Sequence, residues 1–236
     1  TETKPIGIQG GGESAIKFNG ILENVKTWTS EHPNLYKLLI TVNNSGENNG
    51  EVVPYPVGFR RFEIKPVKTG DRTDRLFLVN GQPIKFKGVN IHETNPETGH
   101  YVTEDIMRKD FELMKLNNIN TVRLSHYPQS RRFYELCNEI GLYVYDEANI
   151  ESHGLYYGDK SPSRHPEWEQ AHMDRTVNMF ERNKNQPSVA IWSLGNEAGN
   201  GINFFHTYRY LKDQERYFMN RPVNYERALW DYNTDI

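Results

Sequence analysis

At Trp192-Ser193-Leu194-Gly195-Asn196-Glu197 an apolar run, residues 188–194, ends abruptly in polar side chains. A continuous run of residues that favour β-structure predicts a strand buried on both faces, as in a parallel sheet. Such a strand would hold Glu197 at its C-terminal tip, beside the amide of Asn196. A carboxylate on a rigid strand end, next to an amide that can bind a sugar hydroxyl, suits acid/base chemistry on a glycosidic oxygen. A solvated glutamate before a turn would give the same local pattern.

The rest of the chain repeats this alternation of strand and helix. We expect parallel strands at residues 84–90, 119–124, 142–144, 189–194 and 222–226. Apolar residues recur at helical spacing between them, with Thr103 and Ser130 as expected N-caps and Gly141 as a C-terminal signal. These units fit a doubly wound sheet or a (β/α)8 barrel, and the absence of a glycine-rich phosphate loop after the first strand disfavours a nucleotide-binding sheet. Because a barrel needs eight strands, the fold class is predicted as α/β, a partial (β/α)8 TIM barrel with about five strands, in a chain that is a fragment.

Residues 1–65 are predicted to be the C-terminal part of an immunoglobulin-like β-sandwich, and residues 66–236 the N-terminal part of the barrel. Apolar and polar residues alternate at 36–42, which indicates a half-buried strand, and further strands are expected at 52–53 and 58–64. We expect a loop at 68–74. Asn80-Gly81 lies between two apolar runs and predicts a tight type I′ hairpin turn.

Composition excludes several classes of function. The net charge of −3 gives no broad basic surface, so we expect no nucleic-acid partner. No apolar stretch approaches the roughly 20 residues needed to cross a bilayer, so we expect no membrane partner. The first residues have no signal-peptide core, which leaves the compartment open between cytoplasm and periplasm. The single cysteine, Cys137, cannot form an internal disulfide and is expected to pack in the core.

Polar side chains collect where the expected strands end. In a barrel the active site forms at the C-terminal strand ends, and four consecutive ends carry a histidine, an arginine or a carboxylate. One such histidine alone would more often be structural, whereas four neighbouring ends predict a functional cluster. Glu151 and His153 are two residues apart, so in extended chain they could share a metal, with Mg²⁺, Zn²⁺ or Mn²⁺ all compatible. The candidate residues are His92, Arg123, His126, Glu151, His153, Asn196 and Glu197.

Four motifs carry a resemblance to a known family. They are Phe-Lys-Gly-Val-Asn-Ile-His-Glu at 86–93, Asn-Thr-Val-Arg-Leu-Ser-His-Tyr-Pro at 120–128, Tyr-Val-Tyr-Asp-Glu-Ala-Asn-Ile-Glu-Ser-His-Gly at 143–154, and Gln-Pro-Ser-Val-Ala-Ile-Trp-Ser-Leu-Gly-Asn-Glu at 186–197. In this order they resemble the barrel of glycoside hydrolase family 2, and within it the large bacterial β-galactosidases. Residues 28–36 and 58–60 resemble the end of that family's immunoglobulin-like domain.

The resemblance implies a role for each candidate residue. Glu197 matches the general acid/base, and Asn196 matches the amide that contacts the sugar 2-hydroxyl. Glu151, His153 and Glu197 match ligands of an active-site Mg²⁺. His92 and His126 match histidines that line the galactose site, and Arg123 matches a support for the catalytic carboxylates. The nucleophile of the family lies beyond residue 236, and Glu226 matches no family nucleophile.

The function expected from this resemblance is part of a retaining glycoside hydrolase that cleaves terminal β-D-galactosides. A β-galactoside is therefore the expected partner, and the intact protein is expected to be a homo-oligomer. Thr94-Asn95 departs from the galactosidase pattern, where histidines are frequent, so β-glucuronidase-like or β-mannosidase-like specificity stays open. A carbohydrate-binding or inactive fragment is a further alternative, as is a metal-dependent hydrolase built on Glu151 and His153.

Overall fold

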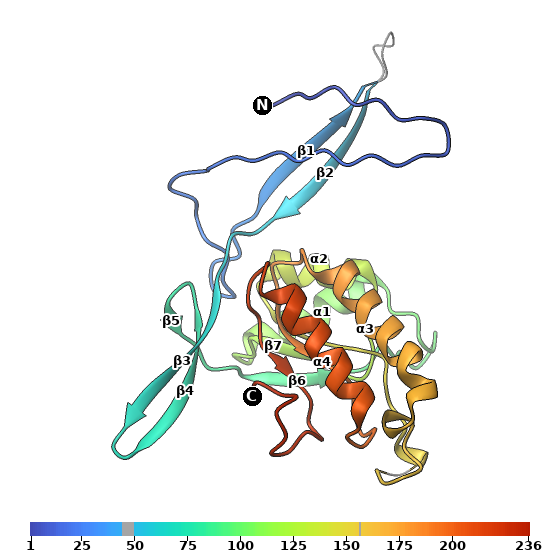
Figure 1. The fold of residues 1–236 in the computed structure, drawn as a ribbon. Helices are drawn as coiled ribbons and strands as arrows, with labels where there is room; N and C mark the ends of the chain where they lie inside the picture. Colours follow the sequence, from blue (N-terminus) through green and yellow to red (C-terminus); the bar gives the residue numbers. More distant parts are fainter. Residues whose placement is uncertain (44–49, 156) are drawn as a thin grey trace.

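A five-stranded parallel sheet with four α-helices forms the larger part of the molecule (Figure 1). The structure, a computed structural model, describes residues 1–43, 50–155 and 157–236. The strand order is β10-β9-β8-β7-β6, and each registered pair is parallel. The strands are β6 (Gly88–Ile91), β7 (Thr121–Leu124), β8 (Tyr143–Glu147), β9 (Val189–Ser193) and β10 (Val223–Asn224).

One α-helix separates each strand from the next along the chain. These helices are α1 (Glu104–Leu116), α2 (Arg131–Ile140), α3 (Glu169–Asn183) and α4 (Ile202–Glu215). Sequential strands are neighbours in the sheet, and a helix joins each to the next, as in a (β/α)8 barrel. The predicted partial barrel of five strands is therefore confirmed. Strand β9 is buried along its whole length, as the apolar run predicted.

The core lies between the sheet and the apolar faces of the helices, and it includes the buried Cys137. Thr103 and Ser130 occupy the N-cap positions of α1 and α2, but neither side chain makes a capping hydrogen bond. Gly141 ends α2 in the left-handed conformation at φ 86°, and an added Cβ would lie 2.3 Å from the carbonyl oxygen of Ser30. Glycine is therefore required here both by conformation and by contact.

The hairpin of β1 (Tyr36–Val42) and β2 (Glu51–Val57) extends away from the helices (Figure 1). All seven side chains of β1 are exposed, so the expected half-burial is wrong. The hairpin is a two-stranded sheet, and within the described ranges no second sheet covers either face. Alternation in the sequence predicted the strand correctly, but burial also needs a partner surface.

A second antiparallel sheet contains β3 (Phe62–Thr69), β4 (Arg72–Val79) and β5 (Gln82–Pro83). The loop expected at 68–74 is wrong, because β3 and β4 pair through to Thr69 opposite Arg72. Polar residues are tolerated in this ribbon because much of it faces solvent. The strand expected at 58–64 begins only at Phe62. The turn at Asn80-Gly81 is confirmed, with φ values of 52° and 81°.

Trp28 joins the N-terminal segment to the base of the barrel sheet. Its side chain is fully buried, its indole N–H donates to the carbonyl of Asn138 at 2.8 Å, and its ring meets Tyr143 edge-on. Arg60 similarly donates to the carbonyls of Gln186 and Pro187, and burial lowers its pKa to about 9. Over the described part of the chain, none of the helices combines the length and apolar character required to cross a bilayer.

Candidate active site

The seven residues predicted from the strand ends form a connected set at one edge of the parallel sheet. The rings of His92 and His126, which follow β6 and β7, lie 5.4 Å apart in an edge-to-face arrangement. Arg123 on β7 donates to Oδ1 of Asn196 at 3.0 Å. Glu151 and His153, beyond β8, contact Asn196 and Glu197 beyond β9. The roles assigned to these residues stay predictions, but their proximity follows from the shared direction of the strands.

A buried carboxylate at the end of β8, Glu147, organises this edge. Its side chain is inaccessible to solvent and accepts two hydrogen bonds from Arg123, at 2.8 and 3.0 Å. Ser193 on β9 donates to the same carboxylate at 2.7 Å, and His126 Nδ1 lies 2.6 Å from its Oε1. Glu147 therefore links its own strand β8 to groups from the two neighbouring strands, β7 and β9, and the guanidinium and carboxylate offset each other's burial cost.

The two faces of β8 carry different chemistry because successive side chains point to opposite sides of a strand. Glu147 joins Arg123 and Ser193, whereas its neighbour Asp146 lies on the helix-covered face. There Tyr134 and Asn183 donate to Asp146 at 2.8 and 2.7 Å. Burial raises the pKa of Asp146 to about 7, and these two hydrogen bonds oppose that rise.

Asn196 connects the buried network to the exposed carboxylates. Its Oδ1 accepts from Arg123, so its Nδ2 is directed elsewhere and donates to Oε1 of Glu151 at 3.3 Å. Its backbone N–H donates to the carbonyl of Ile150 at 2.9 Å, which joins the chains after β8 and β9. Asn196 is 93% buried as a residue, and its amide is oriented from both ends, as a group that must recognise a hydroxyl requires.

Glu197 lies in an irregular bend after β9. Its φ is 41°, in the left-handed region that few non-glycine residues adopt. Gly195 precedes it at φ 151°, and an added Cβ there would lie 2.5 Å from the carbonyl oxygen of Ile150. The carboxylate is contacted on both oxygens, by His153 Nδ1 at 3.1 Å and by Arg227 at 3.7 Å. Backbone strain of this kind is concentrated at functional sites.

Four residues of this region were not among the sequence candidates. Glu147 follows the third strand directly, and its position in Asp-Glu was a signal, but nothing in the sequence indicated which of the two carboxylates faces the site. Glu226 and Arg227 follow β10, where the same strand-end argument applies. Tyr157 gave no sequence signal; its ring stacks on His153, with centroids 5.4 Å apart and 4° between the planes.

The predicted Mg²⁺ ligands Glu151, His153 and Glu197 include hard oxygen donors suited to that ion. Across residues 1–43, 50–155 and 157–236, however, no three His, Cys, Asp or Glu side chains converge closely enough to hold a metal. His153 pairs with Glu197, while Glu151 is engaged by Asn196. The donor types fit the ion, and their arrangement does not.

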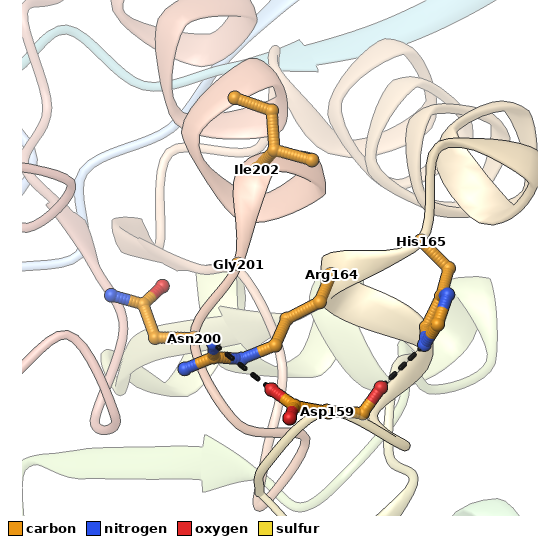
Figure 2. A pocket seen from close by; sticks show the side chains of 6 residues that line it. All are labelled: Asp159, Arg164, His165, Asn200, Gly201 and Ile202. Atoms are coloured by element: carbon orange, nitrogen blue, oxygen red, sulfur yellow. Dashed lines mark hydrogen bonds and ion pairs between the residues drawn. The ribbon is translucent and has the colours of Figure 1, made fainter.

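A hollow of about 450 Å³ opens beside the start of α4 (Figure 2). Asn200 and Gly201 contribute to it from the segment after Glu197, but none of the seven predicted residues lines it. Arg164 lies 3.8 Å from the fully exposed carboxylate of Asp159, a contact worth little in solvent. The hollow therefore does not indicate a different active site from the one formed by the seven predicted residues. Its lining residues are Asp159, Arg164, His165, Asn200, Gly201 and Ile202.

The family is decided by two family models. One described as "Glycosyl hydrolases family 2, TIM barrel domain" matches residues 71–236, and one described as "Glycosyl hydrolases family 2" matches residues 2–60. The chain belongs to glycosyl hydrolase family 2. The fold, the order of the motifs and the resemblance seen in the sequence all agree with this membership.

Curated relatives in this family include beta-galactosidases. The chain is 44% identical to the beta-galactosidase of Streptococcus thermophilus over 240 residues, which cover 97% of this chain and 22% of that protein. It is 45% identical to the beta-galactosidase of Halalkalibacterium halodurans over 206 residues, covering 84% of this chain and 19% of that protein. The chain thus spans about a fifth of the length of these relatives.

Solved structures of glycosidases share the fold. A beta-D-glucuronidase from Dictyoglomus thermophilum matches with a TM-score of 0.70 and 26% identity, over 86% of this chain and 35% of that one. A beta-glycosidase from Bacteroides vulgatus matches with a TM-score of 0.65 and 31% identity, over 84% of this chain and 24% of that one.

Proposed function

We propose that this chain is part of a retaining glycoside hydrolase that cleaves terminal β-D-galactosides, with Glu197 as the general acid/base. The observation that carries the proposal is the position of Glu197. In the bend after β9, its carboxylate lies between His153 and Arg227, and it is next in sequence to the oriented amide of Asn196. A carboxyl group in this setting can protonate a leaving oxygen while the adjacent amide binds a sugar hydroxyl.

The reaction proceeds in two steps. In the first, Glu197 gives its proton to the departing glycosidic oxygen as a nucleophilic carboxylate attacks the anomeric carbon, forming a covalent glycosyl-enzyme. In the second, Glu197 takes a proton from water, which displaces the enzyme carboxylate with net retention. We assign the nucleophile to a residue outside these 236, at a separation of roughly 5 Å from Glu197.

His92 and His126 would then bind the sugar at the ends of β6 and β7. His126 is held through Nδ1 by Glu147, which leaves Nε2 directed away from that carboxylate. Arg123 would act indirectly, by orienting Asn196 and neutralising Glu147. Substrate positioning of this kind supplies much of the rate in such enzymes.

Galactosides are favoured over glucuronides by the degree of similarity. The curated beta-galactosidase relatives are 44–45% identical to this chain, whereas the matched glucuronidase from Dictyoglomus thermophilum is 26% identical. A glucuronidase is the second candidate, because its barrel superposes well on this one.

The test uses the full-length protein that contains this chain and its Glu197→Gln variant. We expect kcat/KM for methyl β-galactoside, whose methoxide is a poor leaving group, to fall by about 10²–10⁴-fold. This is the usual contribution of general acid catalysis. The 2,4-dinitrophenolate group of 2,4-dinitrophenyl β-galactoside leaves without needing a proton. The fall in kcat/KM for that substrate should therefore be far smaller. Glu139→Gln, on the exposed surface of α2, is the control.

Near-normal hydrolysis of methyl β-galactoside by Glu197→Gln would remove Glu197 from the mechanism. A wild-type preference for the matching β-glucuronides would replace the substrate assignment with the second candidate. A comparison of the isolated 236 residues with the intact protein tests the further alternative of an inactive or sugar-binding fragment.

A further inference from the structure

The backbone of Glu197 is held by a side chain from the next strand of the sheet. Its N–H donates to Oε1 of Glu226 at 2.8 Å. The last backbone hydrogen bond between β9 and the chain at β10 runs from the N–H of Leu194 to the carbonyl of Asn224, at 3.0 Å. Three residues further on, the acceptor for the Glu197 N–H is the side chain of Glu226 and not a main-chain carbonyl.

This contact acts at a residue whose backbone conformation needs support. Glu197 has φ 41°, and a non-glycine residue keeps such a conformation only when its surroundings hold it. Release of the N–H would let the turn relax toward ordinary backbone angles and would swing the carboxyl group away from its place. A displacement of about 1 Å at a reacting group can cost about 10²-fold in rate.

Both oxygens of Glu226 are occupied. Oε1 accepts from Glu197, and Oε2 lies 3.2 Å from Nε of Arg227. Arg227 is itself fixed, because its guanidinium lies 4.0 Å above the ring of Tyr157 and donates to the Tyr157 hydroxyl at 2.8 Å. These contacts place the Glu226 carboxylate to hold its neighbours.

The same arginine closes a ring of contacts around Glu197. Arg227 lies 3.7 Å from Oε1 of Glu197, Tyr157 stacks on His153, and His153 lies 3.1 Å from Oε2 of Glu197. Glu226 and Arg227 therefore restrain Glu197 through its backbone and its carboxylate respectively.

We infer that Glu226 is a positioning residue for Glu197, acting through its hydrogen bond to the Glu197 backbone. The inference rests on the proposed function, because it assumes that Glu197 is the general acid/base. Neither the family match nor the strand-end motifs assign a role to Glu226.

The experiment measures kcat/KM, which reports the first chemical step, for methyl and 2,4-dinitrophenyl β-galactosides in the full-length protein. If Glu226 positions the acid, Glu226→Ala lowers the methyl value by about 10²-fold and the dinitrophenyl value only slightly. Glu226→Gln keeps an acceptor oxygen, so it retains most of the wild-type kcat/KM. Glu226→Asp keeps the charge but shortens the side chain by one methylene, so it shows the same selective loss even if the alanine variant fails to fold. Glu139→Ala is a glutamate control of similar exposure on α2.

Equal losses on both substrates, or full activity of Glu226→Ala and Glu226→Asp, would overturn the inference. So would a glutamine variant inactive on both substrates, which is the behaviour of a nucleophile. Glu197→Gln in the same assays distinguishes failure of the inference about Glu226 from failure of the proposed function. If Glu197→Gln loses activity selectively on the methyl substrate and the Glu226 variants do not, only the inference fails. If Glu197→Gln hydrolyses both substrates normally, the proposed function fails.

Discussion

Replacement of Glu147 by glutamine should loosen the edge of the sheet on which the candidate site is built. The buried carboxylate accepts from Arg123 twice and from Ser193 once, and it contacts His126. An amide cannot accept at both ends, and it leaves the Arg123 guanidinium without its counter-charge. Breaking a buried ion pair on one side costs about 3–5 kcal/mol. Because the Arg123 side chain is 25% exposed, we expect the lower end, about 3 kcal/mol.

Hydrogen exchange of peptides spanning β7 and β8 measures this loss of stability locally, so it can be applied to the full-length protein. A fall of about 3 kcal/mol in opening free energy corresponds to exchange about 10²-fold faster. Glu181→Gln is the matched control, because its ion pair with Lys184 lies on the surface and should contribute less than about 1 kcal/mol. Adding Arg123→Met to Glu147→Gln should cause no further loss, because the unpaired charge is then gone. Exchange in β7 and β8 that matches the control would refute this account of Glu147.

Three further predictions concern the turn, the buried aspartate and the metal. Gly195→Ala should lower stability by about 1–3 kcal/mol in urea unfolding and reduce activity that depends on Glu197, because its Cβ would meet the carbonyl of Ile150 at 2.5 Å; Gly158→Ala, in open space, is the control, and equal effects would contradict the argument. Asp146 has a folded-state pKa of about 7 against 3.8 for the free side chain, so the folded state binds the extra proton and this stabilising contribution, full below pH 3.8, is lost as pH rises toward 7. The melting temperature of wild type relative to Asp146→Asn should therefore fall across that interval, and parallel pH curves would contradict it. If Mg²⁺ binds at Glu151, His153 and Glu197, calorimetric titration should detect it in wild type and find it weakened in Glu151→Gln; no binding in wild type would remove the metal from the site.

Much of the candidate site could be predicted from strand ends alone. Asn196 and Glu197 follow the continuous apolar run of β9, Arg123 lies within β7, and His126 comes just after it. Because parallel strands end at a common edge of the sheet, the predicted strand ends were enough to predict that these side chains lie close together. The turn at Asn80-Gly81 was predictable for a similar local reason, since few other residue pairs adopt two positive φ angles.

Predictions failed where the outcome depended on contacts far along the chain. The alternating pattern of β1 predicted a buried face, yet its side chains are exposed because no sheet covers the hairpin among the described residues. The polar stretch at 68–74 was expected to be a loop, but pairing between β3 and β4 extends through it. Local preference is weak for polar residues, so the pairing partner decides their conformation.

The sequence by itself determined the alternation of strands and helices, the family, and the polar residues that each strand end presents, because these depend on local pattern and residue type. Only the tertiary structure decided that Glu147 rather than Asp146 faces the site, that Asn196 is turned by Arg123, and that Glu226 holds the backbone of Glu197. These contacts join residues 24 to 73 positions apart. Their partners are chosen by strand register and the direction of each side chain, which no local pattern encodes.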